Sequence, residues 1–327
     1  MITVSRRSLL LATAGSALCV SVRNSKAELI GHDRPIRVIV PRTPGGSVDI
    51  IGRGWSEGVG RLGCQSFIEN IGGGGGRIGT GLVERATPDG YTLLIGSTSE
   101  IVLSPLVEGG LSNVDLTPVG ILSTSPLAIC ADPSLPIKDL HDLATYAKAN
   151  PDKLNFGSAG TGTIGHVEGE LLKQVMSLKG LTHVPYRGGA AAILDVVGGR
   201  LTFAIVSISA SIVQMNRANK LNVIAVTSST RSEVAPDLSN VVEQGYPQLA
   251  TEFFIGLFAP AAVPEPILNE LEQATRSAMQ DEKLRKTLLE AGFTVPDINR
   301  TAAKTYIQSE IKRWGAVASA AGLVAKQ

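Results

Sequence analysis

The stretch VIVPRTPGGSVDIIGRGW, residues 38–55, decides how the chain begins to fold. Its first three residues are apolar and β-branched, which is typical of a strand buried on both faces. The two prolines that follow cannot extend a strand. After the glycines, apolar residues recur at the spacing of one helix face: Ile51, Trp55, Val59 and Leu62. The stretch therefore predicts a strand, a tight glycine turn and an amphipathic helix.

The start of this predicted helix is suited to an anion. Ser47 is the expected N-cap, and Asp49 falls in the first turn, where the helix dipole stabilises a carboxylate. A strand, a glycine turn and a helix N-terminus together present free backbone N–H groups to an anion. The same construction returns in LNFGSAGTGTIGHVEGELL, residues 154–172. Two such loops, one in each half of the chain, predict two lobes that face one ligand.

Length and charge narrow the class of protein. A chain of 327 residues suits two domains better than one core. Residues 1–27 hold four bases and no acid, so the rest of the chain has 26 Lys and Arg against 29 Asp and Glu, a net charge of −3. This balance, without a run of basic residues, argues against a nucleic-acid partner. After residue 27 no apolar run reaches the roughly 18 residues that a membrane span needs.

The first 27 residues predict an export signal. Arg6 and Arg7 precede an apolar stretch over residues 9–22, and Ser25-Lys26-Ala27 offers a cleavage site near Ala27. The SRRSLL sequence resembles a twin-arginine signal, and an ordinary secretory signal is the alternative. Both predict a periplasmic protein. The residues before Cys19 match the lipoprotein pattern poorly, so no lipid anchor is expected.

Two cysteines remain after the predicted cleavage, Cys64 and Cys130. They could pair in an oxidising compartment. Their predicted positions in different lobes favour two separate buried thiols.

Strand and helix patterns alternate through most of the chain, which predicts a parallel sheet with helices on both faces. Ser97, Thr98 and Ser99 form a predicted polar loop at the carboxyl end of a strand, where open α/β sheets bind ligands. The expected strands are residues 64–71, 91–95, 154–156, 182–185, 201–206 and 222–227, and the expected helices begin at Ile78, Leu140, Ile164 and Ala190.

Two extended apolar segments, residues 126–133 and 252–260, are predicted to cross between lobes. Beyond the second segment three helices follow without a strand of their own, and Thr301 is the expected cap of the last. Its predicted apolar face holds Ile307, Ile311, Trp314 and Val317. These helices pack most economically on the N-terminal sheet, which makes the second lobe an insertion. The two crossing segments then form a hinge beside a cleft.

Several motifs have two interpretations. GGGRIG, residues 74–79, formally matches a dinucleotide fingerprint with Glu100 about 20 residues further on, but a surface turn feeding a helix is favoured. His166 could face the cleft, although a packed or solvated histidine is favoured. Arg187 could bind a carboxylate bidentately, or be a solvated surface residue.

Catalytic patterns are lacking. The four histidines and two cysteines show no metal-ligand spacing. GSAG at residues 157–160 is too short for a nucleophile elbow. Small hydroxyls and backbone N–H groups bind carboxylates well and do chemistry poorly without a base, so the sequence predicts a binder rather than an enzyme.

Six motifs in register, over roughly residues 34–320, resemble the substrate-binding receptors of tripartite tricarboxylate transporters, called Bug-type receptors. The motifs are IVPRTPGGSVD, ATPDGYTLLIGS, LNFGSAGTGTIGH, HVPYRGGAAAILDVVGGR, IAVTSSTRS and FFIGLFAPAAVPEP. The resemblance implies a two-lobed α/β fold of the type II periplasmic binding proteins, with lobes joined by two crossing strands. It implies no catalysis and no cofactor. Lobe 1 would span residues 28–125 plus 254–327, and lobe 2 would be the insertion 126–253.

The resemblance also implies a ligand and a partner. A small carboxylate would lie between the proline-glycine loop of lobe 1 and the Ser158–Thr163 loop of lobe 2, held largely through backbone N–H groups and water, and membrane permease subunits would receive it. A monomer is expected. The expected ligand-binding residues are Pro44, Gly45, Gly46, Ser47, Ser97, Thr98, Ser158, Ala159, Gly160, Thr161, Thr163, Tyr186 and Ser207.

Two positions depart from the family pattern. Arg42 stands where relatives usually have a hydrophobic or aromatic residue. If Arg42 faces the cleft, it favours a more anionic ligand; if it is solvated, it has no bearing on the choice of ligand. Val206 stands where relatives often carry Asp, which argues for a plain carboxylate over an amino acid, or for a receptor that has drifted from transport. The first helix also holds glycines for which the sequence gives no reason: Gly52, Gly54, Gly58 and Gly60.

Two other classes of function stay open. A sensory or partner-binding protein could keep the same fold without serving transport. An exported oxidoreductase would need a cofactor, and the weak fingerprint and missing metal spacing disfavour it.

Overall fold

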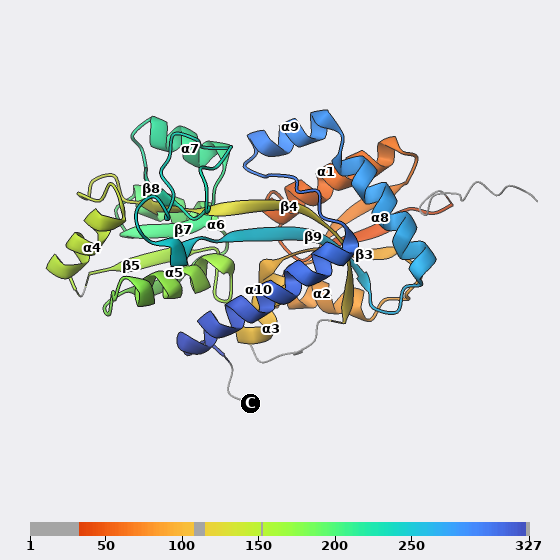
Figure 1. Ribbon diagram of the computed structural model, residues 1–327, viewed down its shortest axis with the longest axis horizontal. Coiled ribbons are helices and arrows are strands. Elements are labelled where there is room, and N and C mark those ends of the chain that lie inside the picture. Colours follow the sequence, from red (N-terminus) through yellow and green to blue (C-terminus); the bar gives the residue numbers. More distant parts are fainter. Residues whose placement is uncertain (1–32, 108–114, 152, 325–327) are drawn as a thin grey trace, which may run out of the picture.

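A computed structural model describes residues 33–107, 115–151 and 153–324. The predicted export signal, residues 1–27, lies outside this range. The described chain forms a two-lobed α/β molecule in which two long strands run between the lobes (Figure 1). The expected fold class is therefore confirmed.

Lobe 1 is built on a sheet that begins with the opening stretch of the sequence. Its strands β1, β2 and β3 are parallel, with β1 in the middle, and β9 lies antiparallel to β3. Helices α1 and α8 pack on each other beside this sheet. The lobe consists of β1 (Ile36–Val40), α1 (Ser47–Arg61), β2 (Ser66–Asn70), η1 (Gly74–Gly76), α2 (Arg77–Glu84), β3 (Thr92–Ser97), η2 (Ser99–Leu103), α3 (Ser104–Val107), β9 (Glu252–Pro260), α8 (Glu265–Met279), α9 (Glu282–Glu290) and the first part of β4 (Leu116–Ala131).

Lobe 2 repeats this plan with a second sheet. Its strands β5, β6 and β7 are parallel, with β5 between the other two, and both β7 and β8 pair antiparallel with the end of β4. The lobe consists of α4 (Leu140–Ala149), β5 (Asn155–Ser158), α5 (Ile164–Val175), β6 (Thr182–Pro185), α6 (Gly189–Val197), β7 (Phe203–Ser207), α7 (Ala210–Arg217), β8 (Asn222–Val226) and η3 (Pro247–Leu249). The C-terminal helix α10 (Arg300–Ala320) contacts β4 and also α5, so it touches elements of both lobes.

Strand β4 joins the lobes because it belongs to both sheets. Its residues 116–126 pair with β9, and its residues 127–131 pair with β7 and β8. The chain returns to lobe 1 through β9. Where the two crossings meet, the Thr227 hydroxyl accepts a hydrogen bond from Leu127 N at 2.8 Å and donates one to Thr251 O at 2.6 Å. A single buried side chain therefore ties both crossing segments together.

Several elements have the bounds that the sequence predicts. Helix α4 and strands β6 and β9 match them in full, and α5 begins at Ile164 as expected. The predicted parallel pairing is confirmed for β1, β2 and β3 and for β5, β6 and β7. It is wrong for β8, which runs antiparallel to β4, and the crossing strands β4 and β9 are also antiparallel to their neighbours. Local patterns gave the strands correctly, but only long-range pairing fixes their directions.

Both predicted helix caps are wrong by one or two residues. Gly46 is the N-cap of α1, and Ser47 is already its first helical residue. The last helix is capped by Asn299, whose side chain accepts a hydrogen bond from Ala302 N at 2.8 Å, and Thr301 lies inside the helix. The Asn299 side chain accepts a hydrogen bond from a free N–H group in the first turn, so the helix begins before Thr301.

The core confirms most of the predicted apolar faces. Ile51, Trp55 and Val59 of α1 are buried, whereas Leu62, the residue after the helix, is 40% exposed. In α10, Ile307 and Trp314 are buried, but Ile311 is 43% exposed, so that position was wrong. Both cysteines, Cys64 before β2 and Cys130 in β4, are buried free thiols in different lobes, as expected.

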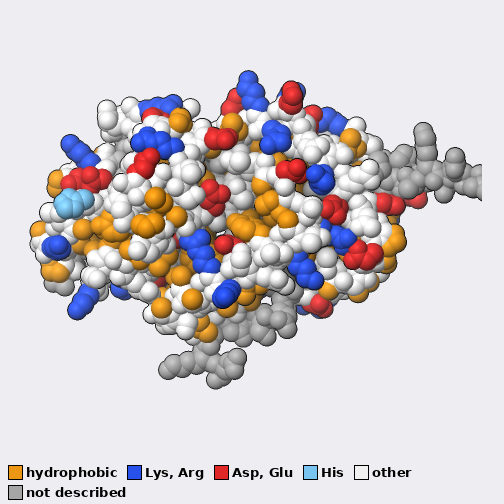
Figure 2. All heavy atoms as spheres, viewed as in Figure 1, with side chains coloured by type: hydrophobic (Ala, Val, Ile, Leu, Met, Phe, Trp, Pro, Cys, Tyr) orange, Lys and Arg blue, Asp and Glu red, His pale blue; other side chains and the backbone are white. Residues whose placement is uncertain are grey.

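No helix among the described residues is long and apolar enough to cross a membrane. On the face shown in Figure 2, acidic and basic side chains are interspersed and neither sign forms a continuous patch.

Candidate functional site

The first glycine loop leads from β1 into α1. Gly45 has a φ of +83°, a conformation that favours glycine, and its N–H donates to Asp49 Oδ2 at 2.9 Å. Pro44, Gly45 and Gly46 are exposed and Ser47 is half-buried. No side chain caps the N-terminus of α1. The helix therefore begins with backbone N–H groups close to solvent.

Asp49 holds the loop in shape. Its carboxylate also accepts hydrogen bonds from Arg53 Nε at 2.9 Å and from Asn70 Nδ2 at 2.9 Å. Burial opposes the charged form of Asp49, but the hydrogen bonds from Arg53, Gly45 and Asn70 outweigh it and lower its pKa. The acid predicted for the first turn thus supports the loop and is not itself offered to a ligand.

The sequence left the role of Arg42 open, and the structure shows its side chain half-buried and paired. Its Nε donates to Glu100 Oε1 at 2.5 Å, and its Nη2 donates to Gly75 O at 3.3 Å. The Glu100 side chain is almost fully buried, and its other oxygen accepts hydrogen bonds from Ser97 N and Ser97 Oγ. The pair joins three loops at the carboxyl edge of the lobe 1 sheet.

This pairing also bears on the dinucleotide fingerprint. The acid that would have to meet a ribose, Glu100, is buried and already engaged. A Cβ on Gly76 would lie 2.7 Å from Glu100 Cγ, so the glycine run gives room to a protein side chain. The favoured interpretation of this motif, a turn feeding a helix, agrees with η1 leading into α2.

The predicted polar loop after β3 is in fact buried structure. Ser97 ends β3, and Ser99 starts the π-helical turn η2. Thr98 is fully buried, and its Oγ1 accepts a hydrogen bond from Phe254 N of β9 at 2.9 Å. The hydroxyls of Ser97 and Thr98 therefore have protein partners, and ligand contact by them stays a prediction.

The second glycine loop leads from β5 into α5. Ser158 Oγ accepts from Gly160 N at 3.2 Å, and Thr163 Oγ1 donates to Gly160 O at 2.7 Å. Thr163 is the N-cap of α5, but its hydroxyl turns back to the loop and does not cap the helix. Ala159 and Gly160 are half-buried and Thr161 is exposed.

Tyr186 and Ser207 flank this loop. Tyr186 N donates to Ser158 O at 3.1 Å, which places Tyr186 directly beside the loop. Its hydroxyl donates to Asp195 Oδ2 at 2.6 Å. Ser207 ends β7, and because β5 and β7 are parallel neighbours, it lies at the same sheet edge as Ser158. Arg187 is exposed and Val206 is buried.

Not all helices in the described chain begin alike. Side chains of Asp139, Ser209, Asp281 and Asn299 cap α4, α7, α9 and α10. The N-cap residue provides no side-chain cap at α1 or α5, the helices after the two glycine loops, nor at α2, α6 and α8. At α5 one N–H reaches lobe 1, since Ile164 N donates to Ser99 Oγ at 3.4 Å. Open N–H groups are suited to carboxylate oxygens.

The histidines form an unexpected pair. His166 and His183 stack with ring centroids 4.0 Å apart, and His183 Nε2 lies 2.7 Å from Ser158 Oγ. His166 is packed, as favoured from the sequence, and lies beside the loop. Within the described residues no group of three or more His, Cys, Asp or Glu side chains could hold a metal ion.

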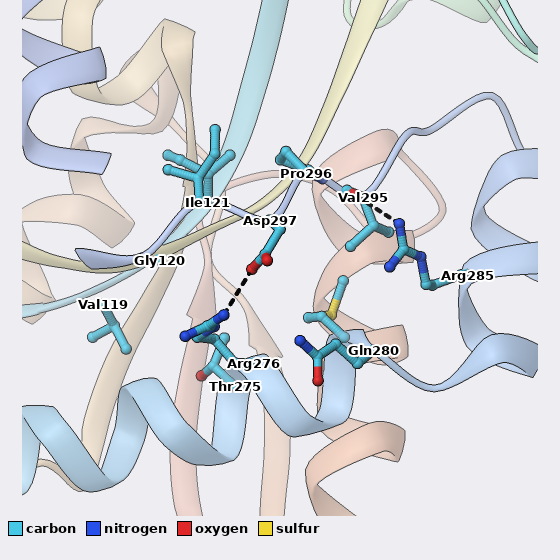
Figure 3. A pocket seen from close by; sticks show the side chains of 12 residues that line it. Val119, Gly120, Ile121, Thr275, Arg276, Gln280, Arg285, Val295, Pro296 and Asp297 are labelled. Atoms are coloured by element: carbon cyan, nitrogen blue, oxygen red, sulfur yellow. Dashed lines mark hydrogen bonds and ion pairs between the residues drawn. The ribbon is translucent and has the colours of Figure 1, made fainter. Parts of the chain in front are cut away.

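A pocket lies elsewhere in lobe 1, between β4, α8 and the segment before α10 (Figure 3). Its two arginines are engaged: Arg276 Nη2 donates to Asp297 Oδ1 at 3.0 Å, and Arg285 Nη2 donates to Val295 O at 3.2 Å. It contains none of the predicted ligand-binding residues.

Sequence reasoning missed the supporting residues of both loops. Glu100 was considered only as part of a nucleotide motif, and His183 was counted only among possible metal ligands. A signal for His183 existed, because it lies in the strand directly after the second loop and one of the six motifs begins with it.

The chain matches a family model described as the tripartite tricarboxylate transporter family receptor over residues 51–323. A UPF0065 protein of Bordetella pertussis is 32% identical over 319 residues, which are 97% of this chain and 98% of that protein.

Two solved structures carry small acids. MatC from Rhodopseudomonas palustris, with bound malate, is 30% identical, with a TM-score of 0.78 over 86% of this chain and 98% of that one. Another R. palustris protein, with adipate, is 27% identical and has a TM-score of 0.81; the match covers 89% of this chain and 98% of that one.

Proposed function

Because this chain belongs to the tripartite tricarboxylate transporter receptor family, we propose that it captures a small carboxylate between its two lobes and delivers it to a permease of that transporter type. It acts as a receptor in the periplasm, without catalysis or a cofactor. Residues 1–27 direct its export and are removed near Ala27.

One observation carries this proposal. Each lobe ends a central parallel strand in a glycine loop, and each loop opens a helix whose own N-cap residue makes no side-chain cap, α1 in lobe 1 and α5 in lobe 2. The carboxyl ends of parallel strands are where open α/β sheets bind ligands. Backbone N–H groups from both lobes can then bind one carboxylate, and closure of the lobes removes it from water.

The proposed site keeps the residues expected from the sequence. Pro44 to Ser47 contribute from lobe 1, and Ser158 to Thr163 contribute from lobe 2, with Tyr186 and Ser207 beside them. Ser97 and Thr98 belong to the proposed site, although their hydroxyls hydrogen-bond to Glu100 and to the Phe254 N–H, so their contribution is to hold the backbone beside the ligand in place. The proposed division into lobes is the one expected from the sequence, 28–125 plus 254–327 and 126–253. The switch of β4 partners between Pro126 and Leu127 supports it.

The ligand is a plain carboxylate. Malate and adipate, the acids in the two similar structures, define the class to try first. Arg42 is paired with Glu100 and so adds little net positive charge to the loop. Val206 offers no carboxylate to an amino group. Both features favour recognition through N–H groups and hydroxyls over recognition of a highly charged or zwitterionic acid.

A thermal-shift screen of residues 28–327 tests this function. The panel holds mono-, di- and tricarboxylates, amino acids and aromatic acids, and the protein is first unfolded and refolded to remove any bound acid. A saturable rise in the unfolding temperature with one acid class is expected. At a hundredfold excess of the acid over its Kd, binding should raise the free energy of unfolding by about 2.7 kcal/mol. A folded protein that responds to no acid would overturn the proposal and favour a partner-binding role. A strain that lacks the gene for this protein separates transport from sensing: loss of uptake of the bound acid indicates transport, and normal uptake indicates a sensory role.

A further inference from the structure

The stacked histidines lie directly under the second glycine loop. His166 is in the first turn of α5 and His183 is in β6, with ring planes 24° apart. Phe156 of β5 packs on His183 with ring centroids 4.9 Å apart. His166 is 6% exposed and His183 is half-buried, so the pair is largely packed against protein on the side below the loop.

Each ring holds one end of the loop. His166 Nδ1 accepts a hydrogen bond from Gly162 N at 3.2 Å. A backbone N–H can only donate, so Nδ1 carries no proton and the neutral ring is the Nε2–H tautomer. His183 Nε2 lies 2.7 Å from Ser158 Oγ, the atom that accepts from Gly160 N. Together the rings fix residues 158, 160 and 162.

Both rings are held neutral. Burial lowers the pKa of His166. Burial, with the neighbouring His166, lowers the pKa of His183 to about 4. A proton added at His166 Nδ1 would turn the acceptor of the Gly162 N–H into a donor, and that contact would be lost.

The surrounding charges do not act as counter-ions. Strands β5, β6 and β7 contain no Asp, Glu, Lys or Arg. On α5, Thr251 and Arg313 lower the pKa of Glu168 and so partly offset the effect of its burial. Glu170 on the same helix forms an ion pair with Lys173 at 3.7 Å. On α10, Glu310 accepts from Trp314 Nε1.

We propose that the His166–His183 pair is the positioning element of the ligand-binding loop, in which two neutral rings fix Gly162 N–H and Ser158 Oγ and so aim the loop's other N–H groups at the bound acid. This inference rests on the proposed function, because it takes the 158–163 loop as the lobe 2 half of the site. Acidification that protonates His166 at Nδ1 releases the loop at Gly162.

Matched variants separate hydrogen bonding from ring packing. His166→Asn keeps an acceptor near the position of Nδ1, and His183→Gln keeps a polar atom near the position of Nε2. His166→Leu and His183→Leu remove these atoms at similar size. His141→Gln, at an exposed position on α4, is the control. The readouts are amide hydrogen exchange of residues 158–163 without any acid, and affinity for malate and adipate at pH 7.5.

The leucine variants should lose about tenfold in loop protection and in affinity, the effect of one hydrogen bond. The Asn and Gln variants should stay within about threefold of wild type, and His141→Gln should be unchanged. In the wild-type protein, nitrogen NMR should show His166 as the Nε2–H tautomer at pH 7.5. That measurement needs no variant and decides the matter if a leucine variant does not fold.

The outcomes distinguish the two proposals. Leucine variants that keep wild-type loop protection and affinity, or a His166 proton on Nδ1, would overturn the positioning role while leaving the receptor function intact. A wild-type protein that binds no acid, with a loop that loosens only in the leucine variants, would refute the receptor function, and with it the aiming of the loop at an acid, while showing that the two rings hold the loop in place.

Discussion

At the scale of single residues, this protein uses charge mostly for support. Arg42, Asp49 and Glu100 all lie beside the first loop, and each is engaged with protein partners. In the proposed receptor function, binding of the carboxylate is left to backbone N–H groups. This division lets the site bind an anion without a buried unpaired cation, which would be costly when the site is empty.

Glu168 is the exception, because neither of its carboxylate oxygens has a hydrogen-bond partner among the described residues. It is fully buried on α5, where α10 packs. Burial raises its pKa to about 8, and the nearby Arg313 offsets this only in part. Glu168 is therefore mostly protonated in the folded protein at pH 7 and ionised in the unfolded chain.

Glu168→Gln should remove a pH dependence of stability. A folded-state pKa above the unfolded value of 4.5 gives stability that is complete below pH 4.5 and is lost as pH rises through 8. Between pH 6.5 and 8 wild type should lose up to about 1.4 kcal/mol per pH unit, and the variant should not. Urea unfolding at both pH values measures this. Glu170→Gln on the same helix is the control; an equal pH slope in Glu168→Gln and wild type would contradict the assignment.

At the scale of elements, the glycines that the sequence left unexplained are packing positions. A Cβ on Gly58 of α1 would lie 2.9 Å from Ala278 Cβ of α8, and one on Gly54 would lie 3.0 Å from Leu284 of α9. In α5, a Cβ on Gly165 would lie 2.3 Å from Ile205 O. At Gly58 and Gly165 the neighbouring atoms are a Cβ and a backbone oxygen that cannot easily move, so only glycine fits, whereas the Leu284 side chain near Gly54 can shift. Gly60 is different, because nothing lies within 4 Å of its Cβ position.

Gly58→Ala and Gly60→Ala should therefore change stability in opposite directions. At Gly58 the clash with α8 should cost about 1–3 kcal/mol. At Gly60 the methyl group meets open space, and the loss of glycine's unfolded-state freedom should stabilise the protein by about 0.5–1 kcal/mol. Denaturant unfolding of the two variants measures both. Two changes of the same sign would show that α1 does not pack on α8 in this way.

The glycine loops make a second prediction at this scale. Gly46 has φ −81° and its nearest neighbour to a Cβ is Thr43 O at 3.8 Å, so valine fits the fold there. Gly46→Val should abolish acid binding, because the side chain covers the N–H groups at the start of α1, with little change in unfolding temperature. Calorimetric titration with malate and adipate measures it, and wild-type affinity would refute the two-loop site. Gly160→Val is a poorer test, since φ +135° at Gly160 strains any side chain.

At the scale of the whole molecule, the lobes are joined by more than two strands. Besides β4 and β9, the segment after α9 pairs with β4 through Thr124 and Thr294, and a Cβ on Gly292 would lie 2.6 Å from Ile208 O of lobe 2. Thr227 closes the hinge by linking Leu127 and Thr251. The connection is therefore a hydrogen-bonded unit that includes more of the chain than the two crossing strands.

Thr227→Val keeps the shape of the side chain and removes both of its hydrogen bonds. Leaving Leu127 N–H and Thr251 C=O buried and unpaired should cost about 2–4 kcal/mol. Exchange protection of the Leu127 amide should fall with it. Thr227→Ser, which keeps the hydroxyl, should stay close to wild type in both measurements. Equal stability of the valine and serine variants would mean that the hinge does not depend on this hydroxyl.

The sequence by itself determined the elements, the two glycine loops and the family. Period and turn chemistry are local properties, so α4, α5, β6 and β9 could be predicted from residues near one another, and the resemblance to the transporter receptors is confirmed by the family match. The separation of Cys64 and Cys130 into two lobes followed from the same reading.

Tertiary structure alone decided what each polar side chain does. Arg42 meets Glu100 across 58 residues, Thr98 meets Phe254 across 156, and Thr227 joins two crossings that are 124 residues apart. Strand directions and the His166–His183 stack depend on the same long-range pairing. No local pattern encodes such partners, because a polar side chain satisfies its hydrogen bonds with whatever the folded chain brings within 3 Å.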